Sequence, residues 1–407
     1  MAETLNILSP VKYDDSLAHY EIHSHQPYVS SAFNNSDEIR IAVQHQDLYI
    51  LPCKSTLHIH GRISKPDNTN VTNTKITSNG ICHLFNDIRY ELNGVEIDGC
   101  KNVGISTNMK FYISQTPNQF MYAENAGHLN VDDTSRVTDD AGYFDVNIPL
   151  SMILGFAEDY RKIVVNAKHE LILTRSRTDL NAVVNILGVE REEFKIVINK
   201  IEWMIPYLFV SDRQKIELLK FIEKDPLISM SFRSWELYEY PLIPATQKHV
   251  WTVKTSTQVE KPRYVILGFQ TNRKDNHARY ANLFDACNLV NVKLFLNSQY
   301  YPYGSLNLNF NQNKFSILYD MYCNFQTSYY GKDSEPILSR KDFKDYAPLA
   351  VIDCSKQNEF LKQASVDVRL EFESSVNFPA NTAAYCLILH DRIIQYKPIS
   401  GLVKKVT

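Results

Sequence analysis

The sequence has little glycine and none of the glycine-rich loops that bind phosphate. Only 13 of its 407 residues are glycine, and no G-x-x-x-x-G-K segment follows a strand-like run. The G-x-S-x-G turn of many hydrolases is also missing. The carboxylates are scattered, with no pair set apart by its neighbours. These absences argue against an enzyme, so we expect no catalytic residues and no cofactor.

Strong charge of either sign and long apolar runs are missing as well. The formal net charge is -3, and the longest basic cluster is Lys404-Lys405. Because nucleic-acid binders usually carry a basic stripe, we expect no dedicated basic arm for nucleic acid. No apolar run approaches the roughly 20 residues of a membrane span. Residues 1–14 lack an apolar core and a cleavage site, so we expect no signal peptide.

Cysteine is sparse and is not arranged for zinc or redox chemistry. The seven cysteines include no C-x-x-C pair. This spacing favours reduced, mostly buried thiols and assembly in a reducing compartment. The seven residues are Cys53, Cys82, Cys100, Cys287, Cys323, Cys354 and Cys386.

Two histidine pairs have the spacing of metal ligands but lack further ligands. His58 and His60 lie two apart on an expected strand and so share one face, and His23 and His25 repeat that spacing. No cysteine or carboxylate is placed by the sequence to complete either set. We interpret the first pair as a polar strand face and the second as a loop pair. Whether His58 and His60 bind a metal stays open at this point.

One serine in the second half of the chain has the neighbours of a candidate nucleophile. Ser355 follows Asp353-Cys354, but no histidine is linked to it by a motif. We predict instead that Ser355 is the N-cap of a helix. The sequence therefore names no metal site and no catalytic site.

What the sequence does contain is short alternating runs rich in β-branched and aromatic residues, which predict strands. Between them lie clusters of Asn, Asp, Ser, Gly and Pro that are typical of loops. The predicted strands cover residues 39–43, 56–63, 88–92, 169–174, 194–203, 251–255, 264–269, 292–296, 366–372 and 385–390.

Helical signals are few. The stretch 211–222 opens with Ser211-x-x-Gln214, a capping box, and then has Ile216, Leu219 and Ile222 at helical spacing. A second stripe is aromatic and is more typical of core packing than of a ligand site. It consists of Phe315, Leu318, Tyr319, Tyr322 and Phe325.

An internal repeat with an offset of about 200 residues is the most informative pattern. An alternating strand ends in Leu-Asn at Asn93 and again at Asn297, 204 positions later. A Pro-Leu pair at Pro149 recurs at Pro348, 199 positions later. Each half then has two more apolar strands in the same order. These matches predict two copies of one β-rich fold.

The repeat leads to an all-β prediction of two tandem jelly-roll β-barrels, with a few short helices in the connections. We predict an N-terminal jelly roll over residues 1–210, including an N-terminal arm over 1–35. A linker helix covers 211–226, and a C-terminal jelly roll covers 227–407.

Several segments together resemble one protein family over roughly residues 35 to 400. The order of motifs is similar to that of the double jelly-roll major capsid proteins of double-stranded DNA viruses. The resemblance is to the smaller members linked with Polinton (Maverick) elements, adintoviruses and virophages. The segments that carry it are Leu84-Phe85, Tyr90-Glu91-Leu92-Asn93-Gly94, Asn147-Ile148-Pro149-Leu150, Gly155-Phe156, His169 to Arg175, Ile201-Glu202-Trp203, Ile352-Asp353-Cys354-Ser355 and Asn381-Thr382-Ala383-Ala384-Tyr385.

This resemblance implies a structural function. It implies a pseudo-hexagonal homotrimer in which each protomer supplies two upright barrels, and an icosahedral shell of such trimers around a DNA genome. The implied partners are further copies of the chain and a penton or minor capsid protein. The implied location is the virion, after assembly in the host cytoplasm or nucleus.

Two other classes of function remain as alternatives. A two-domain β-sandwich that binds a carbohydrate or a receptor would be a monomer or dimer with a specific ligand, and it would not form cages. A β-sandwich hydrolase would need a convergent acidic or histidine-centred site, which the sequence does not show. Self-association therefore discriminates the capsid hypothesis from the binding module.

Overall fold

The fold is known from a computed structural model of the chain. It describes residues 17–28, 32–44, 49–129, 137–185, 192–254, 262–297, 299–356 and 366–406.

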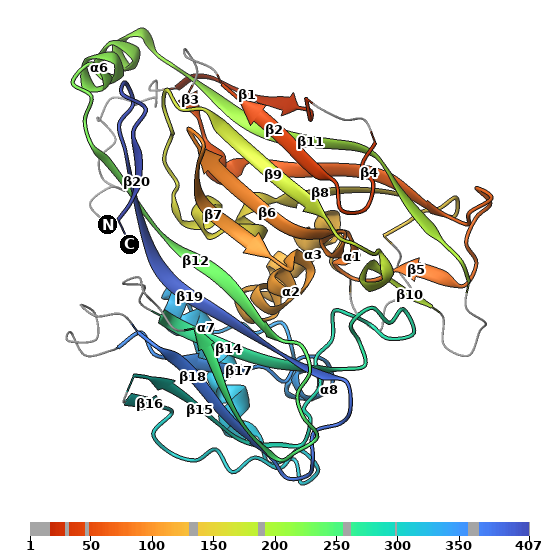
Figure 1. Ribbon diagram of the computed structural model, residues 1–407. Coiled ribbons are helices and arrows are strands. Elements are labelled where there is room, and N and C mark those ends of the chain that lie inside the picture. The colour runs from red at the N-terminus through yellow and green to blue at the C-terminus, as the bar shows by residue number, and fades with distance from the viewer. Residues whose placement is uncertain are drawn as a thin grey trace, which may run out of the picture.

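The first half of the chain forms a five-stranded and a four-stranded antiparallel sheet (Figure 1). The first has the order β1-β11-β4-β8, and short β3 lies beside β11; their bounds are Leu17–His25, Lys195–Val210, Thr56–Ser64, Tyr143–Pro149 and Tyr49–Ile50. The second has the order β2-β9-β6-β7, with bounds Glu38–Val43, His169–Arg175, Phe85–Leu92 and Val95–Lys101. A small separate sheet pairs β5, Thr74–Ile76, with β10, Val183–Asn185.

The second half repeats this arrangement. One sheet has the order β12-β19-β14-β17, and β20 lies beside β19; their bounds are Ile228–Tyr240, Thr382–Tyr396, Pro262–Thr271, Ala350–Asp353 and Val403–Lys405. The other has the order β13-β18-β15-β16, with bounds Lys248–Lys254, Val368–Ser374, Leu289–Leu296 and Gln299–Tyr301.

Strand order identifies both halves as jelly rolls. If the eight main strands of each half are counted along the chain, one sheet holds strands 1, 8, 3 and 6 and the other holds 2, 7, 4 and 5. Two facing sheets built from such crossing connections are the jelly-roll form of a double-sheet barrel. The predicted fold class, two tandem jelly rolls, is therefore confirmed.

The two asparagines of the sequence repeat occupy the same position in the two barrels. Asn93 and Asn297 each follow the fourth main strand with a positive φ, 50° and 54°, which asparagine tolerates better than most residues. The backbone N–H of each donates to the carbonyl oxygen of Lys168 or Asp367. The backbone N–H of Lys168 or Asp367 donates in return to the asparagine Oδ1, over 2.8 and 2.9 Å. Each asparagine thereby fixes the start of the seventh main strand.

The proline match of the repeat does not mark equivalent positions. Pro149 ends β8, whereas Pro348 stands before β17, although both strands are the sixth of their barrel. The strands that follow are equivalent, because β9 corresponds to β18 and β11 to β19. The repeat therefore predicts two copies of one fold correctly. Its Pro-Leu match is the exception, because Pro149 lies at the end of the sixth main strand and Pro348 lies before the start of the sixth main strand.

The helices lie in the connections between strands. Both predicted helices are present, as α6 and α7. Ser211 stands at the N-cap of α6 but makes no side-chain capping hydrogen bond. The helices are α1 Gly80–His83, α2 Val103–Ser114, α3 Pro117–Ala123, α4 Leu150–Ile153, α5 Gly155–Asp159, α6 Asp212–Ile222, α7 Ser316–Tyr330 and α8 Arg340–Tyr346, with single 3-10 turns at Pro52–Lys54, Glu124–Ala126 and Leu180–Ala182.

Helices α2 and α7 extend the repeat beyond the strands. Each follows the fifth main strand of its barrel, β7 or β16, and precedes the sixth. They meet between the barrels, where the Tyr322 hydroxyl donates to the Tyr112 carbonyl over 2.9 Å and the Gln326 amide donates to the Gln115 carbonyl over 2.8 Å. The two copies of the fold are thus joined by equivalent parts.

Each hydrophobic core contains side chains from the other half of the chain. Met230 and Phe232 of β12, together with Ile394 and Tyr396 of β19, are buried in the core of the first barrel. Side chains of α2, which belongs to the first half, are buried in the core of the second barrel. Because each core is completed by the opposite half, the barrels form one body.

The structure corrects the N-terminal arm predicted over residues 1–35. Residues 17–25 form β1, which pairs along its length with β11 and is the first strand of the first barrel. The strand was missed because it is an edge strand whose described side chains are all half-buried or exposed, so it lacks apolar alternation. No helix among the described residues is long and apolar enough to cross a membrane.

Candidate functional site: the seam between the barrels

Three polar joints connect the barrels at the seam where β12 of the second barrel crosses the first barrel. Arg233 on β12 is bound by the carboxylate of Asp159, the last residue of α5. Asp159 accepts from the Arg233 Nη2 over 2.6 Å, and from its Nε and backbone N–H over 2.8 Å. The guanidinium also lies over the Tyr329 ring at 3.7 Å. One arginine thus joins α5, β12 and α7.

A buried carboxylate forms the second joint. Asp98 on β7 is 1% exposed, and its oxygens accept from the Ser234 hydroxyl over 2.6 Å and from the Phe156 backbone N–H over 2.8 Å. Arg392 on β19 lies 3.7 Å away. A buried charge is tolerated only when it is hydrogen-bonded and paired. Asp98 satisfies that condition only while both barrels are in contact.

A third joint surrounds Lys110 of α2. Its ammonium lies 2.7 Å from the Glu158 carboxylate and donates to the Ser151 carbonyl over 2.7 Å. The Tyr330 hydroxyl donates to the other Glu158 oxygen over 2.6 Å. Burial raises the pKa of Tyr330 well above its ordinary value, so this hydroxyl remains a donor.

The barrels approach so closely that one position tolerates no side chain. A Cβ added to Gly155 would lie 1.8 Å from the backbone oxygen of Arg233. Backbone oxygen atoms cannot move aside as a flexible side chain can, so glycine is required here.

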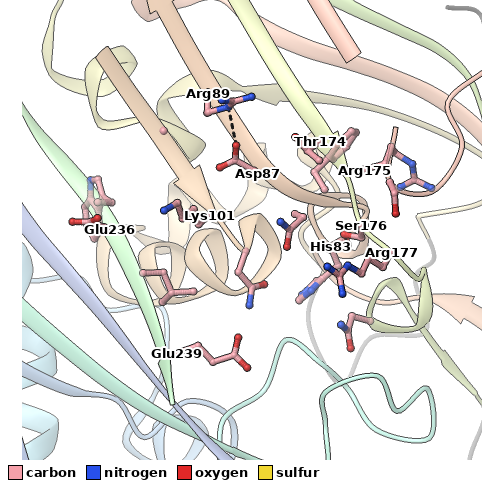
Figure 2. A pocket seen from close by; sticks show the side chains of 18 of the residues that line it. His83, Asp87, Arg89, Lys101, Thr174, Arg175, Ser176, Arg177, Glu236 and Glu239 are labelled. Atoms are coloured by element: carbon pink, nitrogen blue, oxygen red, sulfur yellow. Dashed lines mark hydrogen bonds and ion pairs between the residues drawn. The ribbon is translucent and has the colours of Figure 1, made fainter. Parts of the chain in front are cut away.

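Two clefts lie between the barrels, one on each side of the seam. The larger has a volume of about 1180 Å³ and is lined by β6, β7 and β9 of the first barrel and by β12 (Figure 2). Its charged groups pair with one another, as in the ion pairs Arg89–Asp87 at 3.0 Å and Lys274–Glu239 at 2.5 Å. The smaller, of about 830 Å³, lies beside α2, α3 and α7. In the larger cleft the Ser176 hydroxyl donates to the backbone carbonyl of His83 over 2.8 Å, while the His83 ring bonds to Asn108.

The first histidine pair lies on the outward face of β4. His58 is bonded through Nδ1 to Glu202 at 3.2 Å and through Nε2 to Asp145 at 2.6 Å, while His60 stacks on Tyr143. The two carboxylates occupy opposite ring nitrogens, so they cannot share one ion with the imidazole. Within the ranges that the structure describes, no group of three or more His, Cys, Asp or Glu side chains is placed to hold a metal.

The second histidine pair is not in a loop. His23 and His25 lie on β1, where His23 bonds to Glu21 at 2.7 Å and the Tyr207 hydroxyl bonds to His25 at 2.9 Å. The loop interpretation was wrong for the reason that β1 itself was missed. Ser355 follows β17, and its backbone N–H donates to Asp353. The segment 357–365 lies outside the described residues, so its N-cap role stays a prediction.

The cysteines make no disulfide. All seven are described, none is bonded to another, and five of them are buried. Burial raises the pKa of the Cys82 and Cys100 thiols to about 12, which keeps them protonated and unreactive.

A buried polar cluster around α2 gave no signal in the sequence. The Asn79 side chain donates to the Thr107 hydroxyl over 2.8 Å and to Asn108 over 3.0 Å, and Asn108 bonds to the His83 ring. All twelve residues of α2 are buried, so the helix has no polar face. The pattern of an amphipathic helix was therefore not available to predict it.

Two jelly rolls of the same strand order, fused through one seam, define a double jelly-roll protein. A family model described as a double jelly roll-like domain matches residues 74–394, well over half of the chain. The chain therefore belongs to the double jelly roll-like family, as its resemblance predicted. A comparison with curated proteins found no match.

Solved structures agree with this assignment of the fold. VP54 of the virus PBCV-1, as fitted into a cryo-EM reconstruction of the virophage Sputnik, is similar with a TM-score of 0.62 and 11% identity, over 98% of this chain and 99% of that one. The major capsid protein of Faustovirus has a TM-score of 0.57 and 9% identity over 96% and 93%. That of mavirus has a TM-score of 0.54 and 12% identity over 100% and 93%. At these identities the similarity shows the fold.

Proposed function

We propose that this chain is a major capsid protein. Three copies form a pseudo-hexagonal trimer with six barrels around its axis, and these trimers assemble into an icosahedral shell that encloses a DNA genome. The chain acts without enzymatic activity. It belongs to the virion, is assembled in the host cytoplasm or nucleus, and contacts a penton or minor capsid protein. Its lineage is that of the Polinton, adintovirus and virophage group.

The observation that carries this proposal is the fusion of two barrels into one body along the full length of the chain. A six-lobed trimer needs two barrels per protomer at a fixed relative orientation. Asp98 and Arg233 supply that orientation through charge pairs across the seam, and Glu158 adds the hydrogen bond from the Tyr330 hydroxyl. The known structures with this fold include capsid proteins matched over almost their whole length, which supports the same function here.

Light scattering on the purified full-length chain, over a wide range of concentration, tests the proposal. A mass three times that of the chain is expected, because obligate capsid interfaces are large. A monomer at every concentration would contradict it. A monomer that bound a glycan on a glycan array would support the alternative of a carbohydrate-binding module.

A further inference from the structure

One helix of the molecule is amphipathic yet buries none of its residues. Helix α6 joins the two barrels and lies outside both, at one end of the molecule (Figure 1). Leu218 and Ile222 rest against a small apolar cluster at the edge of the first barrel. On either side of that contact Ile216, Leu219 and Phe221 are 53%, 52% and 48% exposed. The helix therefore contacts the barrel through one narrow row of its own side chains, and its other large apolar side chains remain exposed to water.

The apolar area continues onto the second half of the chain. Asp225, just after α6, accepts from the backbone N–H of Ile399 over 2.9 Å and of Ser400 over 3.3 Å, which holds the turn after β19 against the helix end. Leu227, Ile399 and Leu402 are each more than half exposed here. We call the combined area the α6 surface; it comprises Ile216, Leu219, Phe221, Leu227, Ile399 and Leu402.

The two segments that form the α6 surface, 211–227 and 397–406, carry an excess of positive charge, although the whole chain is acidic. They contain seven cationic side chains and four carboxylates. The cations are Arg213, Lys215, Lys220, Lys224, Lys397, Lys404 and Lys405, and the anions are Asp212, Glu217, Glu223 and Asp225. Two ion pairs, Arg213–Glu217 at 3.6 Å and Lys397–Asp225 at 4.0 Å, leave the local excess positive.

From this combination we infer that the α6 surface binds an anionic lipid membrane, with α6 lying in the plane of the headgroups. Exposed Leu, Ile and Phe beside lysines are the composition of helices that lie in a membrane interface. Lysine stems can extend along apolar surface while their ammonium groups reach lipid phosphates. Each lysine near an anionic bilayer adds attraction that salt weakens.

A second copy of the chain fits the α6 surface less well. Protein interfaces are depleted in lysine at their centres, whereas six of the seven cations here are lysines. Nucleic acid would use the cations but gives aliphatic side chains no partner. The lipid proposal does not depend on shell formation, because it needs only a folded protomer.

Flotation with vesicles tests the inference. Full-length protein is mixed with vesicles of phosphatidylcholine and phosphatidylserine in equal amounts, or of phosphatidylcholine alone. We expect the protein to float with the anionic vesicles and much less with the neutral ones. Failure of the unaltered protein to float with phosphatidylserine vesicles would overturn the proposal.

Two variant pairs locate the contact. Leu219→Ser with Phe221→Ser removes exposed apolar groups, and we expect about tenfold weaker binding to anionic vesicles. The matched control, Leu242→Ser with Val250→Ser, removes equally exposed apolar groups from the second barrel and should bind as the unaltered protein does. If the control weakens binding equally, the α6 surface is not the site.

Charge reversal provides an independent variant, because exposed lysines contribute little to folding. Lys220→Glu with Lys224→Glu should weaken binding about tenfold or more, while Lys314→Glu with Lys341→Glu should not. Unchanged binding by the first pair would overturn the proposal even if the apolar variant failed to fold. A change in oligomer size caused by Leu219→Ser and Phe221→Ser would also overturn it, since the surface would then be a contact between copies.

Discussion

At the scale of single residues, a few side chains hold strained or crowded positions that the fold requires. Asn93 and Asn297 keep a positive φ at equivalent turns and bond to the same backbone groups in the two barrels. Gly155 lies where the two barrels touch backbone to backbone. Three of the buried histidines, His83, His128 and His169, have a pKa that burial lowers. Each of these positions makes a prediction.

Two substitutions at Asn297 separate the stability that comes from its Oδ1 hydrogen bond from the stability that comes from its tolerance of a positive φ. Asn297→Gly keeps a backbone that accepts positive φ but loses the Oδ1 hydrogen bond, so the free energy of unfolding should fall by about 1 kcal/mol. Asn297→Ala loses both and should cost about 2 kcal/mol. Urea denaturation measures both values. Equal losses for the two variants would show that the backbone conformation contributes nothing.

Gly155→Ala should damage the seam between the barrels. The added Cβ meets the Arg233 backbone oxygen at 1.8 Å, so we expect a loss of about 3 kcal/mol in the free energy of unfolding. Gly304→Ala is the matched control, because a Cβ there meets nothing within 4 Å, and it should stay within about 0.5 kcal/mol. The measurement is thermal denaturation of the two variants side by side. Equal melting temperatures would contradict the close approach of Gly155 to the Arg233 backbone at the seam.

The buried histidines predict loss of stability in mild acid. Burial lowers the pKa of His83 to about 4 and the pKa values of His128 and His169 to about 3. Below the ordinary value of 6.5 the unfolded chain therefore binds protons that the folded chain does not. Their stabilising contribution is complete above about pH 6.5 and is lost as the pH falls toward 4. Each histidine contributes a slope of about 1.4 kcal/mol per pH unit in that window.

A single variant tests this pH dependence. His128 stacks on Phe111 at 3.9 Å, and His128→Phe keeps an aromatic ring without the titration. The slope of unfolding free energy against pH, measured by urea denaturation between about pH 6 and 4, should then decrease by about 1.4 kcal/mol per unit. An unchanged slope would mean that His128 takes up its proton in the folded state too.

At the scale of secondary structure, the sequence predicted some of the strands that bury one face and missed others, such as β8 and β12. On β4, buried Leu57, Ile59 and Ile63 alternate with outward polar groups, and this strand was predicted almost to its ends. A strand that buries neither face, or both faces, does not show alternating apolar and polar residues. No described side chain of β1 is buried, and the four-residue β17 is buried in three successive positions.

The seam could not be predicted, because it depends on contacts between distant segments. The joint at Asp98 unites β7, β12 and β19, which are separated by more than a hundred residues. Helix α2 is buried on every side and includes Thr107, Asn108 and Lys110, whose polarity favours a surface position in isolation. Only the tertiary partners of these side chains make their burial tolerable.

Cutting the chain at the linker tests how the halves depend on each other. We propose the boundary between the barrels at residues 211–226, around α6. A protease site inserted after Lys224, which is exposed, should be cleaved in the folded protein. The halves 1–224 and 225–407 should then elute together in size-exclusion chromatography, because Met230 and Tyr396 are buried in the first core. Separation of the halves without denaturant would contradict the shared cores.

At the scale of the whole molecule, two copies of one fold act as a rigid pair. The strand order is the same in both barrels, and in both the connection between the fifth and sixth main strands carries a helix that meets the other. Each core also contains side chains from the other half. A rigid pair of barrels is the unit from which three protomers can build six similar lobes. Polar joints at its seam fix the angle between the barrels, and apolar burial supplies the affinity.

Electron microscopy of the purified full-length protein tests the central claim most directly. If two fused jelly rolls form a capsid protomer, class averages should show trimers with six lobes around a threefold axis, or closed particles built from them. Averages that show only isolated two-lobed protomers, at every concentration up to the highest that can be imaged, would contradict the account.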